Sequence, residues 1–354
     1  MRILTVVGNR PQFIKAAAVS GPLRERHSEL LVHTGQHHDD SLSQIFFTEL
    51  GLARPDRELG IAGGSNTSQT ARMLGALEPL LSTASPDAVL VYGDTNSTLA
   101  GALAAAQAGI AVVHIEAGMR SFDRLMPEEL NRVLTDHLSA LLLCSSQTAS
   151  DNLARESVAG RVVLAGDVMV DVAQRWQPAA RADTSVSAAY GLRPGSYLLL
   201  TAHRAGNVDD PTRLAALVAL IEALPGPVLF PLHPRTRARL TASGLMARVQ
   251  ALGAVTLTGP LGYAEFSALV CQARAVVTDS GGVQKEAYLA GVPCVTLRAS
   301  TEWVETVTSG WNTLVDLDPA AALAALASPP PAARPQLYGD GRAAERCVEA
   351  IGAL

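Results

Sequence analysis

The chain has 354 residues, of which 48% are hydrophobic and 17% are charged, so general disorder is excluded and a large core is expected. The length predicts about two domains at roughly 150 residues for each domain. A net charge of -5 argues against nucleic acid or an anionic membrane as the main partner.

Short apolar runs alternate with longer helical patterns along almost the whole chain. The runs are apolar throughout, which is typical of strands buried on both faces of a parallel sheet that helices cover. The predicted strands are ILTVV, LLVHT, AVLVY, AVVHI, ALLLC and VVLA in the first half, and YLLLT, PVLFP, AVTLT, AVVTD and PCVTL in the second. Helices are predicted over 98–108, 128–140, 213–224 and 283–290.

An Ala/Pro/Gly/Ser-rich stretch over 177–196 is the predicted linker between two α/β halves. We expect one Rossmann-like domain over 1–176, with a last helix over 341–354 packing back on it, and a second over 177–340. Open parallel sheets bind ligands at the carboxyl ends of their strands. Two such halves facing a central cleft would bring their strand-end residues to one ligand.

In the first half, ionisable residues follow three of the predicted strands. Arg10 and Lys15 lie where the first strand passes into a helix, a place where two cations suit a diphosphate. A solvated Arg and a surface Lys are the alternative there. Asp94 and Glu116 each follow a strand directly, and Asp94 has helix capping as its alternative role.

The segment MPEELNR predicts a helix that begins with Glu128 and Glu129 and carries Arg132 one turn later. Acidic residues also favour the dipole at a helix start, so a purely structural role is the alternative for both glutamates.

In the second half, the stretch TDSGGVQKEA predicts a strand end, a helix N-cap at Ser280 and a helix opened by Gly281 and Gly282. Free N–H groups at such a helix start bind anions, and a carboxylate at Glu286 suits a sugar diol. A capped helix with a solvated Glu is the alternative. Two further strands end in His203 and in His233, of which we favour His203 as functional.

Other ligands lack support in the sequence. The GxGxxG fingerprint of dinucleotide sites is absent after the first strand, and the four cysteines form no metal-binding spacing. No run approaches the roughly 18 apolar residues of a membrane-spanning helix, and the first apolar run is too short for a signal peptide. We expect a cytoplasmic protein that needs no metal and no nicotinamide cofactor.

Together these residues suit a nucleotide diphosphate whose attached group reacts. An anion cradle and a diol-binding Glu would hold the nucleotide, and three carboxylates in the other half would handle protons. Carboxylates that lie close together push one another's pKa upward, which suits acid and base roles near neutral pH.

Read end to end, the sequence resembles the non-hydrolysing UDP-N-acetylglucosamine 2-epimerases, a family with the two-domain GT-B fold. The resemblance rests on segments that follow one another in order: GNRPQFIKAA, HTGQHHD, YGDTNSTLAGALAA, HIEAGMRSFDRLMPEELNRVLTDH, AGDVMVD, TAHRAGNVDDP, PLHPRTR, TDSGGVQKEA and PCVTLRASTEWVE. It implies that UDP is eliminated as the C2 proton is removed, and then added back as a proton reaches the other face.

The resemblance also implies roles for single residues. The acid/base set falls on Asp94, Glu116 and Glu128, with His203 assisting near the diphosphate. The UDP contacts fall on Arg10, Lys15, His203, Ser280, Gly281, Gly282 and Glu286, with Glu286 on the ribose. Phe266 matches an aromatic residue beside the uracil, and Arg132 matches a residue near the acids. A homodimer and a place in polysaccharide biosynthesis are further implications.

Some positions depart from the common pattern of the family. Trp303 stands where some members have Arg, and Asp39 stands where members regulated by a second substrate molecule have Gln. The pieces QFIKAA, GDVM, QKEA and TEWVE resemble the branch that acts on UDP-2,3-diacetamido-2,3-dideoxyglucuronate. Its C6 carboxylate would need a cation, for which Arg120, Arg124 and Arg204 are the candidates. A glycosyltransferase on the same fold, a non-catalytic sugar-nucleotide binding protein and a hydrolysing epimerase are the remaining alternatives.

Overall fold

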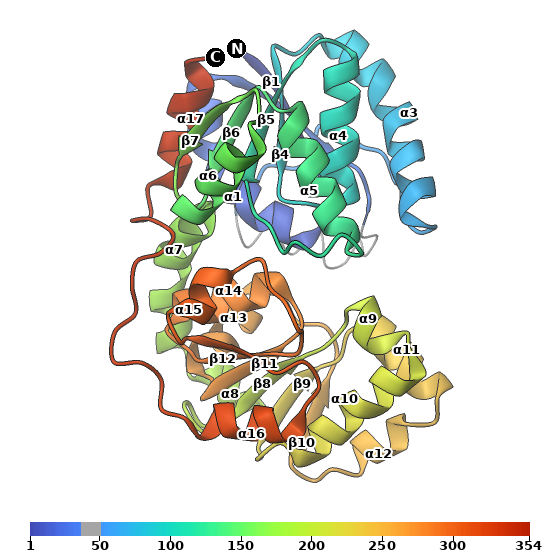
Figure 1. Cartoon of the computed structure of the whole chain (residues 1–354), viewed down its shortest axis with the longest axis vertical. Helices are drawn as coiled ribbons and strands as arrows, with labels where there is room; N and C mark the ends of the chain where they lie inside the picture. The colour runs from blue at the N-terminus through green and yellow to red at the C-terminus, as the bar shows by residue number, and fades with distance from the viewer. Residues whose placement is uncertain (37–50) are drawn as a thin grey trace. The chain divides into compact units, whose positions relative to one another are not determined.

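The chain folds into two compact units, each built on a parallel β-sheet with interleaved helices (Figure 1). Met1–Gln174 and Gln336–Leu354 form unit 1, and Arg175–Pro335 forms unit 2. The computed structural model describes residues 1–36 and 51–354, so Asp39 lies outside the described residues. The α/β class expected from the continuous apolar runs is confirmed.

Unit 1 contains a seven-stranded sheet in the order β3-β2-β1-β4-β5-β6-β7, with every neighbouring pair parallel. Its strands are β1 (Arg2–Val7), β2 (Ser28–His33), β3 (Arg57–Glu58), β4 (Ala88–Tyr92), β5 (Ala111–Ala117), β6 (Leu141–Cys144) and β7 (Arg161–Leu164). Its helices include α1 (Arg10–Arg26), α3 (Asn66–Ala84), α4 (Asn96–Gln107), α5 (Pro127–Leu138), α6 (Gln147–Glu156) and α17 (Ala343–Gly352), while α7 (Val168–Ala182) runs across the boundary between the units.

Unit 2 contains a six-stranded sheet in the order β10-β9-β8-β11-β12-β13, again with parallel neighbours. Its strands are β8 (Leu198–Thr201), β9 (Val228–Pro231), β10 (Val255–Thr258), β11 (Ala275–Thr278), β12 (Cys294–Thr296) and β13 (Asn312–Leu314). The helices are α8 (Ser185–Ala189), α9 (Ala205–Val208), α10 (Pro211–Ala223), α11 (Pro234–Ala242), α12 (Met246–Gln250), α13 (Tyr263–Gln272), α14 (Gly281–Ala290), α15 (Val304–Thr308) and α16 (Pro319–Ala327).

The predicted linker over 177–196 follows the boundary between the two units and is partly helical, because α7 continues to Ala182 and α8 begins at Ser185. Alanine favours helix wherever the chain packs, so an Ala-rich stretch need not be a loop. The short strands β3 and β13 were not predicted. Each has only two or three residues, which is too short for a hydrophobic pattern to show.

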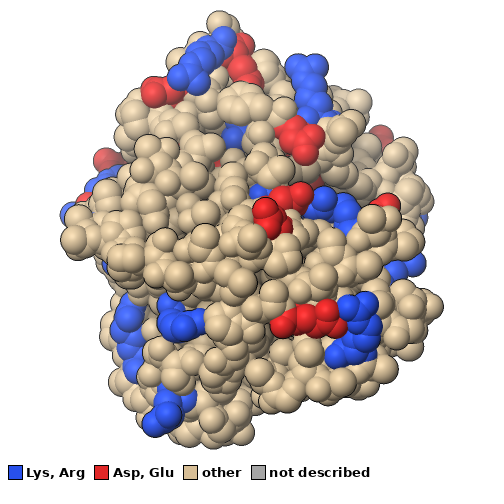
Figure 2. Space-filling view, turned by 60° about the horizontal axis from the view of Figure 1, so that its bottom comes forward, with Lys and Arg blue, Asp and Glu red and all other residues tan. Residues whose placement is uncertain are grey.

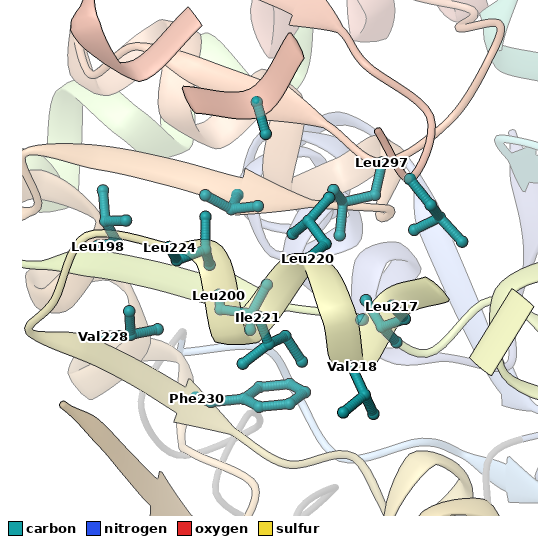
Figure 3. Packing of buried hydrophobic residues seen from close by; sticks show 14 of the residues in the cluster. Leu198, Leu200, Leu217, Val218, Leu220, Ile221, Leu224, Val228, Phe230 and Leu297 are labelled. Carbon is teal, nitrogen blue, oxygen red and sulfur yellow. The ribbon is translucent and has the colours of Figure 1, made fainter. Parts of the chain in front are cut away.

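Apolar strands are buried on both faces, as their sequences predict. In unit 2, residues of β8 and β9 pack against one side of α10, which presents Leu217, Leu220 and Ile221 at helical spacing (Figure 3). Helix α10 begins cleanly because Asp210 caps it through the N–H of Arg213 at 2.9 Å and Pro211 occupies its first position. This packing fixes the strand ends that follow β8 and β11.

The last helix, α17, lies beside α1 within unit 1, close to both chain ends (Figure 1). Asp171 on α7 accepts hydrogen bonds from the N–H groups of Ala343 and Ala344 at 3.1 and 2.9 Å. A carboxylate at that end of a helix satisfies N–H groups that have no partner inside the helix. The segment that returns from unit 2 is thereby joined to unit 1.

Charged side chains on the face shown in Figure 2 lie in small groups, with acidic and basic neighbours side by side on a largely uncharged surface. Such a mixed distribution differs from the broad basic stripe of nucleic-acid-binding domains. Across residues 1–36 and 51–354, no helix is long and apolar enough to cross a membrane.

Candidate active site

The strand order of each sheet reverses at one place, and ligands of such sheets bind there, beyond the carboxyl ends of the strands. In unit 1 the reversal lies between β1 and β4, and in unit 2 it lies between β8 and β11. Arg10, Lys15 and Asp94 follow the first pair of strands. His203 and Ser280 follow the second pair. The predicted site residues therefore gather at the strand ends where a ligand is expected.

Glu116 and Lys15 form an ion pair at the carboxyl end of the unit 1 sheet, with 10% and 9% of their side chains exposed. Glu116 has a φ of 70°, a left-handed conformation that is strained for a residue with a side chain. The pairing of β5 with β6 shifts register between Ile115 and Ala117, so the chain bulges at Glu116. The bulge turns this carboxylate out of the strand's regular alternation.

Gly93 lies directly against this ion pair. A side chain at Gly93 would begin 3.2 Å from Lys15 Nζ and 3.3 Å from Glu116 Oε1, and its φ of 61° is also left-handed. Glycine alone meets both requirements without strain or crowding. The turn that carries Asp94 thus passes beside Glu116, so two of the three predicted acids lie in neighbouring turns.

Asp94 is paired with the buried Arg132 of α5, and 30% of its side chain stays exposed. The alternative of a capping role fails, because Thr95 is the N-cap of α4 and forms a reciprocal capping box with Thr98. The Arg132 guanidinium also bonds Glu129 at 3.0 Å. Arg132 therefore joins Asp94, which follows β4, to Glu129 on its own helix α5.

The two glutamates at the start of α5 have different environments. Glu129 is buried and accepts hydrogen bonds from the N–H and hydroxyl of Ser121 at 2.9 and 3.0 Å, and from the N–H of Phe122 at 2.9 Å. It holds the turn before α5. Glu128 is half-buried, and at i+4 spacing it shares the helix face of Arg132. Glu128 is the glutamate that remains available for chemistry.

Gln12 on α1 was not recognised from the sequence. Its amide nitrogen donates to Tyr92 O at 2.8 Å and to the hydroxyls of Thr95 and Thr98 at 3.0 and 2.9 Å, while its oxygen accepts from Gly8 N at 2.7 Å. One buried side chain thereby ties the loop after β1 to the loop after β4. Arg10 is half-buried and is the first residue of α1, two residues before Gln12.

In unit 2, Ser280 is the N-cap residue of α14, but its side chain makes no capping hydrogen bond to the helix. A side chain at Gly281 would clash with the Glu302 carboxylate, which explains this glycine by packing inside the chain. Gly282 is exposed, and a Cβ there would meet nothing within 4 Å. Gly282 is therefore the glycine whose missing side chain leaves room for an external anion.

Asp279 is a second residue that the sequence did not single out. Its fully buried carboxylate accepts from the N–H of His203 at 3.0 Å, from the N–H of Arg204 at 2.9 Å and from the Asn207 amide at 3.2 Å. It fixes the loop after β8 next to the start of α14. The His203 ring is stacked on the His233 ring, with 5.1 Å between the ring centroids.

Cations gather near the start of α14. Arg298 Nη1 lies 2.9 Å from Glu302 Oε2, Arg204 Nη2 lies 4.0 Å from Glu302 Oε1, and Lys285 Nζ lies 4.0 Å from the centre of the Trp303 ring. The Trp303 ring face thus contacts the Lys285 ammonium. Arg120 is ruled out as a partner for a substrate carboxylate, because it is buried between Asp136 and Glu156.

Two predicted nucleotide contacts lie on helices of unit 2. Glu286 is half-buried on α14, and Phe266 is 6% exposed on α13 within the core cluster of that unit. Within the described part of the chain, no group of His, Cys, Asp and Glu side chains is arranged to hold a metal ion. Burial raises the pKa of the Cys144 and Cys294 thiols to about 12, which keeps both cysteines protonated and inert.

Comparison with known proteins identifies the family. The family model described as UDP-N-acetylglucosamine 2-epimerase matches residues 23–352. A UDP-2,3-diacetamido-2,3-dideoxy-D-glucuronate 2-epimerase of Pseudomonas aeruginosa is 45% identical over 366 residues, covering 100% of both chains. A UDP-N-acetylglucosamine 2-epimerase of Methanocaldococcus jannaschii is 40% identical over 323 residues, covering 89% of this chain and 88% of that protein.

Solved structures agree with this result. The crystal structure of the Methanocaldococcus jannaschii UDP-GlcNAc 2-epimerase in complex with UDP-GlcNAc and UDP matches with a TM-score of 0.94 at 38% identity, covering 100% of each chain. The enzyme of Neisseria meningitidis bound to UDP-GlcNAc matches with a TM-score of 0.88 at 28% identity, again over 100% of each chain. The GT-B type of fold expected from the sequence is confirmed, and the chain belongs to the UDP-N-acetylglucosamine 2-epimerase family of isomerases.

Proposed function

We propose that the protein is a non-hydrolysing 2-epimerase that interconverts UDP-N-acetylglucosamine and UDP-N-acetylmannosamine. The observation that carries this proposal is the pair of neighbouring turns in unit 1. One holds Glu116 in a strained conformation, and the other presents Asp94 one residue after Gly93. Strained residues that carry carboxylates at a strand end are a recurrent feature of catalytic sites.

The reaction proceeds by elimination and re-addition. A carboxylate takes the proton from C2, the C1–O bond breaks with its electrons going to UDP, and a C1=C2 double bond forms. UDP oxygen then re-forms the bond to C1 while a proton is delivered to C2 from the opposite face. Asp94, Glu116 and Glu128 form the acid/base set, because a change of face needs a proton carrier on each side of the sugar.

Unit 2 holds the leaving group. The amino end of α14, from Ser280 through Gly281 to the open Gly282, receives the diphosphate, and Glu286 accepts from the ribose hydroxyls. His203 lies beside the diphosphate as negative charge develops on UDP, and Phe266 faces the uracil. Arg10 and Lys15 are further phosphate contacts, and Arg132 orients Asp94. Elimination and re-addition involve no hydride transfer, so we expect no nicotinamide cofactor, and we also expect no metal ion.

A second substrate is favoured by specific observations. The relative at 45% identity is a UDP-2,3-diacetamido-2,3-dideoxy-D-glucuronate 2-epimerase, and the partly exposed Arg204 side chain lies near the start of α14. A C6 carboxylate would be attracted to such a guanidinium group. We expect Arg204 to be its partner, because 24% of this side chain is exposed.

Incubation of the protein in deuterated water tests both the reaction and the substrate. With UDP-N-acetylglucosamine or its 2,3-diacetamido uronate analogue as the only sugar, we expect deuterium at C2 of the true substrate and the appearance of its 2-epimer. A glycosyltransferase would leave C2 unlabelled without an acceptor, and a hydrolysing enzyme would release free sugar at the rate of turnover. Glu116→Gln should bind UDP but lose most of the exchange.

The wider setting is also part of the proposal. We expect a homodimer in the cytoplasm that supplies an activated amino sugar to polysaccharide biosynthesis. Sedimentation of the purified protein tests the oligomeric state independently of activity.

A further inference from the structure

His114 on β5 lies in a fully buried position between two hydrogen-bond acceptors. Its Nδ1 is 2.7 Å from Asp136 Oδ1 on α5, and its Nε2 is 2.7 Å from the carbonyl oxygen of Gly93. A carbonyl oxygen and an ionised carboxylate only accept, so each ring nitrogen must carry a hydrogen to make its bond. The geometry therefore requires a buried imidazolium.

The charged side chains around the His114 ring offset one another. Burial would raise the pKa of the Asp136 carboxyl, but the bond from His114 and the charges of His114 and Arg120 outweigh burial and hold that pKa below its ordinary value. Arg120 donates a hydrogen bond to Asp136 Oδ2 at 2.7 Å and donates two more to the Glu156 carboxylate through two of its nitrogens. His137 also faces Glu156, and the Cys144 thiol near Asp136 stays neutral because its pKa is about 12. The result is an ionic network of two cations and two anions inside unit 1.

This network holds the backbone on both sides of the acid/base residues. Gly93, whose carbonyl accepts from His114, immediately precedes Asp94. Gly118, two residues after Glu116, donates its N–H to Asp136 Oδ2 at 3.1 Å. Helix α5 meanwhile pairs Arg132, one turn before Asp136, with the Asp94 carboxylate. Helix α5 thus fixes Asp94 in two ways. Arg132 pairs with its side chain. Asp136, through His114, holds the Gly93 carbonyl oxygen that precedes it.

We propose that His114 is a positioning residue for the acid/base carboxylates, acting through its bridge between Asp136 and Gly93. The inference rests on the proposed epimerase function, because it assigns the turnover of that reaction to the placement of Asp94 and Glu116. His114 is fully buried, so it acts on the reaction through these two turns. A displacement of about 1 Å in a reacting group can cost about 100-fold in rate.

Two amide variants separate the two ends of the bridge. His114→Gln can keep a donor near Gly93 O but loses the bond to Asp136, whereas His114→Asn keeps a donor near Asp136 and cannot reach Gly93. His137→Gln is the matched control, because His137 lies on α5 next to Asp136 with 47% of its side chain exposed and contacts the same network only through Glu156.

We expect kcat to fall about tenfold to about 100-fold in His114→Asn, less in His114→Gln, and not at all in His137→Gln, with UDP affinity unchanged in all three. The primary isotope effect with C2-deuterated substrate should increase in His114→Asn as proton transfer becomes limiting. Wild-type kcat in His114→Asn, or parallel losses of kcat and UDP affinity that follow the folded fraction, would overturn the proposal.

A spectrum of the wild-type protein tests the inference without any variant. With ¹⁵N-labelled histidine, one of the eight histidines should show two ring N–H groups that are protected from exchange at neutral pH. Absence of such a ring overturns the proposal even if His114 variants fail to fold. A wild-type protein that shows this ring but no exchange at C2 would instead overturn the proposed function.

Discussion

The Lys15 ammonium bonds the Glu116 carboxylate at the point where β5 bulges, so an acidic residue with a left-handed backbone is neutralised from the neighbouring helix α1. Both side chains are about nine-tenths buried. The sequence placed Lys15 on the diphosphate and Glu116 on the sugar. If Lys15 also binds the diphosphate, as the sequence predicts, a ligand phosphate and Glu116 would share this cation.

Replacing Lys15 by Met tests that sharing. Removing one partner of a buried ion pair leaves the other charge poorly compensated, so we expect a loss of about 3 to 5 kcal/mol in the free energy of unfolding, with loss of turnover. Because Glu116→Gln removes the same pair, the double variant should lose less than the sum of the single variants. Of the two single variants, Lys15→Met should lower UDP affinity and Glu116→Gln should not. Urea unfolding and calorimetric titration with UDP measure both effects, and full additivity would contradict the coupling.

Glu128 and Glu129 are neighbours with different predicted variant effects. Glu129→Gln weakens charge-assisted hydrogen bonds to Ser121, Phe122 and Arg132, so we expect it to lower the free energy of unfolding by about 2 kcal/mol or more. Glu128→Gln should keep wild-type stability and lose most of the deuterium exchange at C2. The reverse pattern would exchange the roles assigned to the two glutamates.

Gly281 and Gly282 form a second matched pair. Gly281→Ala forces a methyl group against Glu302, which we expect to cost about 1 to 3 kcal/mol of stability through overpacking. Gly282→Ala meets open space and should stabilise α14 by about 0.5 kcal/mol. It should nevertheless weaken UDP binding, since the methyl group would stand where the diphosphate approaches. Unchanged UDP affinity in Gly282→Ala would remove the amino end of α14 from the binding site.

Stability at low pH should depend on the buried network of Asp136 and Glu156. Asp136 has a lowered pKa despite burial because of His114 and Arg120, and the hydrogen bond from Arg120 lowers the pKa of Glu156. A carboxyl with a lowered folded-state pKa stabilises the protein above its ordinary pKa, and that contribution is lost as pH falls through the folded value. We therefore expect the urea midpoint to decline between about pH 5 and about pH 1.

Asp136→Asn is the variant that isolates this contribution. It should be less stable than wild type near neutral pH and should show a shallower decline on acidification. An equally steep decline in the variant would assign the acid sensitivity to other carboxyls, among them Asp340, whose bond with Arg346 lowers its pKa to about 2.

Long apolar strands and the residues directly after them could be predicted from the sequence, because a parallel sheet leaves its functional side chains at strand ends. The positions of Asp94, Glu116, His203 and Ser280 at strand ends were predicted in this way. Gln12, His114 and Asp279 were not, because their importance arises from hydrogen bonds to backbone atoms brought close only by the fold. Arg120 was misread for a related reason, since its two acidic partners lie on different helices.

In the proposed mechanism, UDP leaves C1 and returns during each turnover. Substrate that carries ¹⁸O in the oxygen bridging C1 and the β-phosphate tests it directly. We predict that the label spreads into the non-bridging oxygens of the β-phosphate while C2 epimerises, because the freed phosphate rotates before it adds back. Epimerisation at C2 with the label held entirely in the bridge would contradict the elimination of UDP.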